Sequence, residues 1–195
     1  EVERKIMTRL TISPRSEFSP IWFPDNRRLA FLLDIPLFAV HQMAADGGGE
    51  PVLLRSSTFD NYAESISADG RWIAIRQSAP DTRGDLLAMP LDGEGEERVI
   101  RKSPFDERFA SFSPVGRYVA YESHVKGRFE VYVQPFIAEG PRVQLTRDGG
   151  RSPLWASSGE IFVWNNGSLY VAEAATDPVL RVAELERPAG PGGSR

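Results

Sequence analysis

The chain has two histidines, and they limit the acid–base chemistry that it could perform. A serine hydrolase needs its nucleophile on a sharp turn, typically G-x-S-x-G, with a histidine within hydrogen-bonding reach. No such pentapeptide occurs, and the segment GGRSPLW around Ser152 lacks the required spacing. His41 is expected in a strand and His124 in a polar connection, so neither is expected beside a nucleophile. These residues predict that the chain is not an enzyme.

Glycosidase chemistry is a second candidate, because sialidase-type Asp boxes follow S-x-D-x-G-x-x-W. The run from Ser67 to Trp72 is compressed and lacks the residue between Asp69 and Gly70. We interpret it as a hairpin turn followed by a core aromatic residue. A channel with paired carboxylates could also support such chemistry, but the sequence identifies no pair.

No metal or cofactor site is predicted. Cysteine is absent, which excludes disulfides, thiolate metal sites and a cysteine nucleophile. The run AADGGGE from Ala44 lacks the alternating ligands of a calcium loop, and no Gly-Lys-Ser/Thr follows its glycines. We interpret it as a hairpin turn.

Composition excludes further classes of partner. The 195 residues carry a net charge of −4, so no basic excess is available for nucleic acid. No stretch approaches 18 apolar residues, so no membrane insertion of this segment is expected. The start, EVERKIM, has no hydrophobic signal core, so either a leader lies outside this sequence or the protein is cytoplasmic.

An internal repeat organises the chain. Four segments align, with Pro24, Ala68, Pro114 and Ser157 at equivalent positions and spacings of 44, 46 and 43 residues. A period near 40–45 residues is typical of a four-stranded propeller blade. Each unit has two short strands around a turn at Asp25-Asn26, Asp69-Gly70, Val115-Gly116 or Ser158-Gly159.

A third and a fourth strand follow each pair, giving strands a to d, with strand a lining the channel and strand d at the outer edge. The third strands are PLFAVHQM, GDLLAMPL, RFEVYVQPF and GSLYVAEA, and the fourth are EPVLLRS, ERVIRKS, PRVQLTR and PVLRVAEL. The recurring aromatic residues are expected to pack between blades: Trp22, Trp72, Phe112, Tyr118, Tyr121, Trp155 and Trp164. The fold class is therefore all-β, a β-propeller of four four-stranded antiparallel blades.

The predicted boundaries are residues 14–57, 58–103, 104–148 and 149–187 for the four blades. Residues 1–13 resemble a blade's outer strand, either the last of a preceding blade or a closing strand. Residues 188–195, rich in proline and glycine, are expected to be disordered.

The repeat resembles the WD-like propeller repeat of the TolB type, whose signature reads roughly W/F-S-P-D-G-R-x-hydrophobic-A-hydrophobic. The resemblance covers about residues 16–186 and is strongest from Phe105 to Phe136, although Val115 replaces the turn aspartate. That stretch is similar to propellers fused to bacterial serine/threonine protein kinases and to some winged-helix regulators. The resemblance implies a scaffold that binds proteins, peptides or small ligands.

The connections from strand d to the next strand a are the predicted recognition site, since they gather on one propeller face. Two of them are alike, TFDNYAES and PFDERFAS, and exposed loop residues on a rigid scaffold commonly carry recognition. The candidate ligand- or partner-binding residues are Phe59, Asp60, Asn61, Phe105, Asp106, Glu107, Arg108 and Arg151. In the alternative interpretation, the two phenylalanines pack between blades and the two aspartates cap turns.

The leading functional hypothesis is a non-catalytic sensor or interaction module from a larger bacterial signalling protein, such as a receptor-like kinase. Such a parent would place this region on the extracytoplasmic side. The alternative is the gating propeller of a prolyl oligopeptidase-type peptidase, without its hydrolase domain. Four blades would leave apolar faces and strand edges unpaired, so either further blades or self-association of two copies is expected.

Overall fold

The computed structural model describes residues 7, 9–176 and 180–187. They form four antiparallel sheets of four strands each, and no helix that could span a membrane occurs among them. In each sheet the strand order follows the sequence, as expected for propeller blades. The predicted tail at 188–195, and residues 1–6 and 8 of the predicted outer strand, lie outside the described residues.

Strand bounds follow the repeat closely. Blade 1 contains β1 Glu17–Trp22, β2 Arg28–Ile35, β3 Leu37–Ala44 and β4 Val52–Arg55; blade 2 contains β5 Asn61–Ile66, β6 Trp72–Gln77, β7 Asp85–Pro90 and β8 Arg98–Arg101. Blade 3 contains β9 Glu107–Phe112, β10 Tyr118–Val125, β11 Arg128–Pro135 and β12 Val143–Gln144; blade 4 contains β13 Arg151–Trp155, β14 Glu160–Asn165, β15 Ser168–Ala175 and β16 Arg181–Val182.

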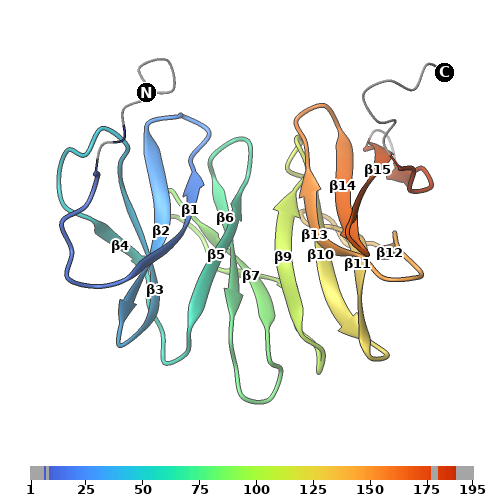
Figure 1. Ribbon diagram of the computed structural model, residues 1–195, viewed down its shortest axis with the longest axis horizontal. Helices are drawn as coiled ribbons and strands as arrows, with labels where there is room; N and C mark the ends of the chain where they lie inside the picture. Colours follow the sequence, from blue (N-terminus) through green and yellow to red (C-terminus); the bar gives the residue numbers. More distant parts are fainter. Residues whose placement is uncertain (1–6, 8, 177–179, 188–195) are drawn as a thin grey trace.

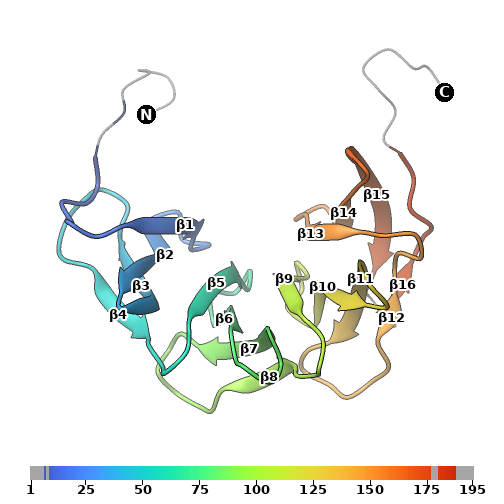
Figure 2. The same cartoon turned by 60° about the horizontal axis from the view of Figure 1, so that its bottom comes forward.

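The blades are arranged in an arc (Figures 1 and 2). Strands β1, β5, β9 and β13 follow its inner edge, and β4, β8, β12 and β16 follow its outer edge (Figure 2). This agrees with the predicted order of strands a to d. Because successive strands run antiparallel, the d-to-a and b-to-c connections share one end of the blades, and the a-to-b and c-to-d hairpins share the other.

Apolar side chains between neighbouring blades form three separate cores. Blades 1 and 2 bury Leu32 and Val40 against Ile73, with similar clusters at the next two junctions. Tyr121 is fully buried between blades 2 and 3, and Trp155 is 6% exposed between blades 3 and 4. Two-sided burial explains the continuous apolar runs in strands b and c.

The a-to-b turns contain the left-handed residues that the sequence predicts. Asn26, Gly70, Gly116 and Gly159 all have positive φ. In blade 2 the Asp box-like run is a hairpin turn: Ser67 Oγ donates to Asp69 Oδ1 at 2.5 Å and accepts from the Trp72 amide at 2.9 Å. Side-chain hydrogen bonds of this kind fix a turn without a ligand.

Two predicted inter-blade aromatics are placed differently. Trp22 is 57% exposed and Trp164 50% exposed, so the prediction that they pack between blades is wrong. Each pairs across its sheet with a residue of a face that no other blade of the described residues covers: Trp22 with Leu29 in blade 1, and Trp164 with Leu169 in blade 4. The repeat pattern placed both in strands but could not distinguish terminal blades from internal ones.

The segment before β1 crosses the outer face of blade 1, which is the face directed away from blade 2. Residues 9–13 form no strand, and Leu10 packs against Phe31, Leu33 and Met43 of that face. The predicted outer strand is therefore not formed among these described residues. The segment instead covers apolar side chains that an adjoining blade would otherwise meet.

Candidate functional site

A shallow cavity of about 570 Å³ opens at the end of the blades where the d-to-a connections lie. The connections before β5 and β9 contribute to it, together with the b-to-c connection of blade 2 at residues 78–84. We call it the rim cavity; its charged and aromatic lining is Phe59, Asp60, Arg76, Arg83, Asp106 and Arg108. Four of these six residues are among the sequence-predicted candidates.

Asp60 is held by blade 1. Its Oδ1 accepts a hydrogen bond from the Phe38 amide at 2.9 Å, and its carbonyl accepts one from the Ser78 amide at 2.9 Å. The Phe59 amide donates to Ser57 Oγ at 3.1 Å. The connection is thereby fixed against blade 1 and against the end of β6, which gives the cavity a defined wall.

Asp106 and Arg108 form the opposite wall. Arg108 Nε donates to Asp106 Oδ1 at 2.9 Å, and a second bond joins the other guanidinium nitrogen to Oδ2. Hydrogen bonding to the Asp106 carboxylate is the main cause that raises the pKa of Arg108, so the guanidinium stays charged. Gly84 lies against this wall, and an added Cβ there would come within 2.8 Å of the Glu107 carbonyl oxygen as well as of Asp106 Oδ1. Because the carbonyl belongs to the backbone and cannot easily move, this position favours glycine.

Asn61 and Glu107 do not reach the cavity. Both are fully buried and belong to equivalent polar clusters, in which each contacts the serine at the second position of its own connection, Ser57 or Ser103. Asn61 Oδ1 also accepts from Arg55 Nε at 2.9 Å, whereas Glu107 accepts from Ser123 Oγ at 3.1 Å. Burial is the main cause that raises the pKa of Glu107. These contacts stabilise the base of the rim.

The two remaining predicted residues lie outside the cavity lining. Phe105 is 39% exposed beside the rim. Arg151 Nη2 pairs with Glu122 Oε1 at 3.4 Å, and its guanidinium lies 4.5 Å from the Phe129 ring centre. Arg151 therefore joins blade 4 to blade 3.

Glu64 and Arg76 were not predicted from the sequence. Arg76 lines the cavity with its Nε 3.3 Å from Glu64 Oε1 and its guanidinium 3.8 Å from the centre of the Tyr62 ring. Burial is the main cause that raises the pKa of Glu64 to about 7, opposed by Arg76 and by the Phe109 amide. One signal was available: Glu64 occupies the position of Pro20, Ala110 and Pro153 in the other repeats, so an acid replaces proline or alanine.

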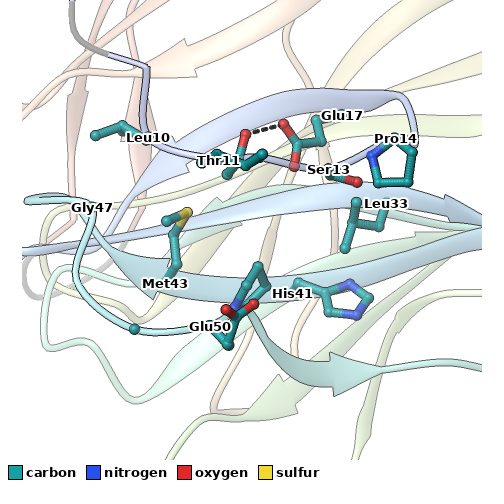
Figure 3. A pocket seen from close by; sticks show the side chains of 13 residues that line it. Leu10, Thr11, Ser13, Pro14, Glu17, Leu33, His41, Met43, Gly47 and Glu50 are labelled. Carbon is teal, nitrogen blue, oxygen red and sulfur yellow. Dashed lines mark hydrogen bonds between the residues drawn. The ribbon is translucent and has the colours of Figure 1, made fainter.

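A second cavity, of about 470 Å³, lies between the segment before β1 and the outer face of blade 1 (Figure 3). Thr11 Oγ1 donates to Glu17 Oε2 in this lining (Figure 3), and the buried His41 has its Nδ1 3.2 Å from the Ala39 carbonyl oxygen. Among the described residues, no hydrogen bond joins His41 to a hydroxyl or carboxyl group of this cavity.

Comparisons with known proteins bear on the fold. No family model and no curated protein matches the chain. TolB from Acinetobacter baumannii matches 92% of the chain with a TM-score of 0.66 and 17% identity, and the chain spans 45% of that protein. A putative TolB from Agrobacterium tumefaciens matches 91%, with a TM-score of 0.64 and 16% identity, over 82% of its own length.

A prolyl endopeptidase is also similar, with a TM-score of 0.60 and 14% identity over 91% of the chain and 29% of the enzyme. At such identities the likeness concerns architecture, because one propeller scaffold carries many unrelated activities. The chain therefore has the fold of a TolB-like β-propeller.

Proposed function

We propose that the chain is a non-catalytic propeller module that binds a protein or small-ligand partner at the rim cavity. The observation that carries this proposal is that Phe59, Asp60 and Asp106, from two separate connections, meet Arg108 of β9 in one cavity. Charged and aromatic side chains on rigidly held loops are suited to recognition. We further propose a parent protein of the bacterial signalling class, such as a receptor-like serine/threonine kinase, which rests on the sequence resemblance.

A ligand screen tests the binding role. Saturation-transfer NMR against a broad set of peptides and metabolites should detect ligands whose signals disappear in Asp60→Ala and Arg83→Ala variants. The matched control is Arg27→Ala, because Arg27 is exposed on an a-to-b turn at the opposite end of the blades. Ligands that bind all three variants equally would place recognition elsewhere.

The gating propeller of a prolyl oligopeptidase-type peptidase is the second candidate. The similarity to a prolyl endopeptidase supports it, as does the lack of a G-x-S-x-G sequence, since in such enzymes a separate domain carries the nucleophile. The sequence of the intact parent protein distinguishes the two: a hydrolase domain supports gating, and a kinase domain supports the signalling role.

A further inference from the structure

The charged residues around the rim cavity differ in how they are engaged. Three arginines line it, Arg76, Arg83 and Arg108, together with two aspartates, Asp60 and Asp106. Arg108 is engaged by Asp106. The exposed guanidinium of Arg83 has no hydrogen-bonded or ionic partner among the described residues. Arg76 is paired with Glu64, and Asp60 accepts a hydrogen bond from a neutral amide, so the cation whose donors are all free for a ligand is Arg83.

Arg76 is oriented for a second contact. Its Nε is directed to Glu64, and its plane is held by the Tyr62 ring, so its side chain is only 16% exposed. The terminal nitrogens keep their donor capacity, since the hydrogen bond to Glu64 uses Nε. A guanidinium held in this way loses little conformational freedom when it binds a planar anion.

Resting on the proposed function, we propose that the rim cavity binds a carboxylate of an acidic peptide through Arg76 and Arg83. Asp60 and Asp106 on the same lining oppose a doubly charged phosphate more than a singly charged carboxylate. Leu37, which is 37% exposed, and Phe59 also line the cavity and provide apolar surface for a neighbouring peptide side chain.

Glu64 couples this site to pH. Its carboxyl group contacts Arg76 on β6, and Arg108 on β9 and Glu122 on β10 also act on it electrostatically. When Glu64 is ionised it competes with the ligand for Arg76; when it is protonated the full charge of Arg76 faces the ligand. A carboxylate at Arg76 also raises the pKa of Glu64 further, so binding near neutral pH takes up protons.

The test uses two matched pools of acetylated, amidated pentapeptides, one with a central glutamate and the other with glutamine at that position. Titration calorimetry should detect the glutamate pool alone, and Arg83→Ala should weaken its binding about tenfold. Arg27→Ala should leave binding unchanged, and inorganic phosphate at equal concentration should not compete. Circular dichroism melting of each variant verifies that it is folded.

Protonation supplies a separate readout. Binding of the glutamate pool should weaken roughly fivefold to tenfold between pH 6 and pH 8, and this dependence should be absent in Glu64→Gln. Heats measured in buffers of different ionisation enthalpy should reveal proton uptake in the wild type. Equal binding of both pools, no binding of either, or unchanged affinity in folded Arg83→Ala would overturn the inference. Neutral ligands that still bind through Asp60 would leave the proposed function standing.

Discussion

Glu64 is the residue whose chemistry departs furthest from its ordinary behaviour. It is an acid on an inner strand, side by side with an arginine that faces a cavity. The repeat predicted Asp60 and Asp106 because their loops are alike, but it did not predict Arg76 and Arg83, which occur in segments without such a likeness. The contact between Glu64 on β5 and Arg76 on β6 depends on the register of the two strands and on the bulge between Ala63 and Ser65. Neither the register nor the bulge could be determined from residue types.

The pKa of Glu64 makes stability depend on pH. Because the folded protein holds this proton up to about pH 7 whereas the unfolded chain releases it near 4.5, the stabilisation is complete below pH 4.5 and is lost as pH rises through 7. The loss is on the order of 3 kcal/mol. Burial raises the pKa of Glu122 and Glu107 too, which adds to the same trend.

Urea unfolding at pH 5, 6, 7 and 8 measures this effect. Glu64→Gln should flatten the fall in stability and exceed the wild type at pH 8, since glutamine resembles the neutral acid. Glu173→Gln, at an exposed position of β15, is the control and should leave the trend in place. A wild type whose stability rises between pH 5 and pH 7 would refute the assignment.

The strands and turns differ in how far their conformation can be predicted from local sequence. Strand positions, strand order and turn residues were predictable because β-branched and aromatic runs alternate with turn signals every few residues. Left-handed residues inside strands were not predictable. Positive φ angles occur at bulges in β1, β9 and β13, at Ser19, Phe109 and Ser152. None of these residue types signals such a conformation.

The a-to-b turn of blade 3 lacks a contact that blade 2 has. Asp69 Oδ1 accepts from Ser67 Oγ and from the Arg71 amide at 3.0 Å, whereas the equivalent of Asp69 in blade 3 is Val115, which is 52% exposed. Val115→Asp should restore both hydrogen bonds and raise the free energy of unfolding by about 0.5–1 kcal/mol. Chemical denaturation measures it, with Val115→Ala to separate the gained bonds from the lost valine; no gain over Val115→Ala would contradict the prediction.

The whole molecule is an arc with two unlike end faces. On blade 1 the segment around Leu10 covers part of the apolar surface. On blade 4, Leu154 is 61%, Trp164 50% and Leu169 42% exposed on one side of the sheet. A cluster of large apolar side chains on one face favours association. The sequence repeat gave the number of blades, but it did not show which side chains would be exposed on the end faces.

Self-association through this face is the expected consequence. Sedimentation velocity over a range of concentrations should show dimers, and Trp164→Glu should weaken their formation by at least about tenfold, because a charge would have to be buried. Val99→Glu is the matched control, since Val99 is 63% exposed on β8 at the outer edge of blade 2. A wild type that sediments as a single species of one chain at all concentrations would count against association.

Amide hydrogen exchange with and without the glutamate-containing peptide pool shows whether recognition takes place at the d-to-a end of the blades. Exchange should slow in residues 56–60, 78–84 and 102–106, which border the rim cavity, because a bound ligand restrains these connections. The hairpins at the other end, 45–51 and 91–97, should be unaffected. Protection confined to those hairpins, with none around the rim cavity, would place recognition at the opposite end and contradict a binding site at the d-to-a connections.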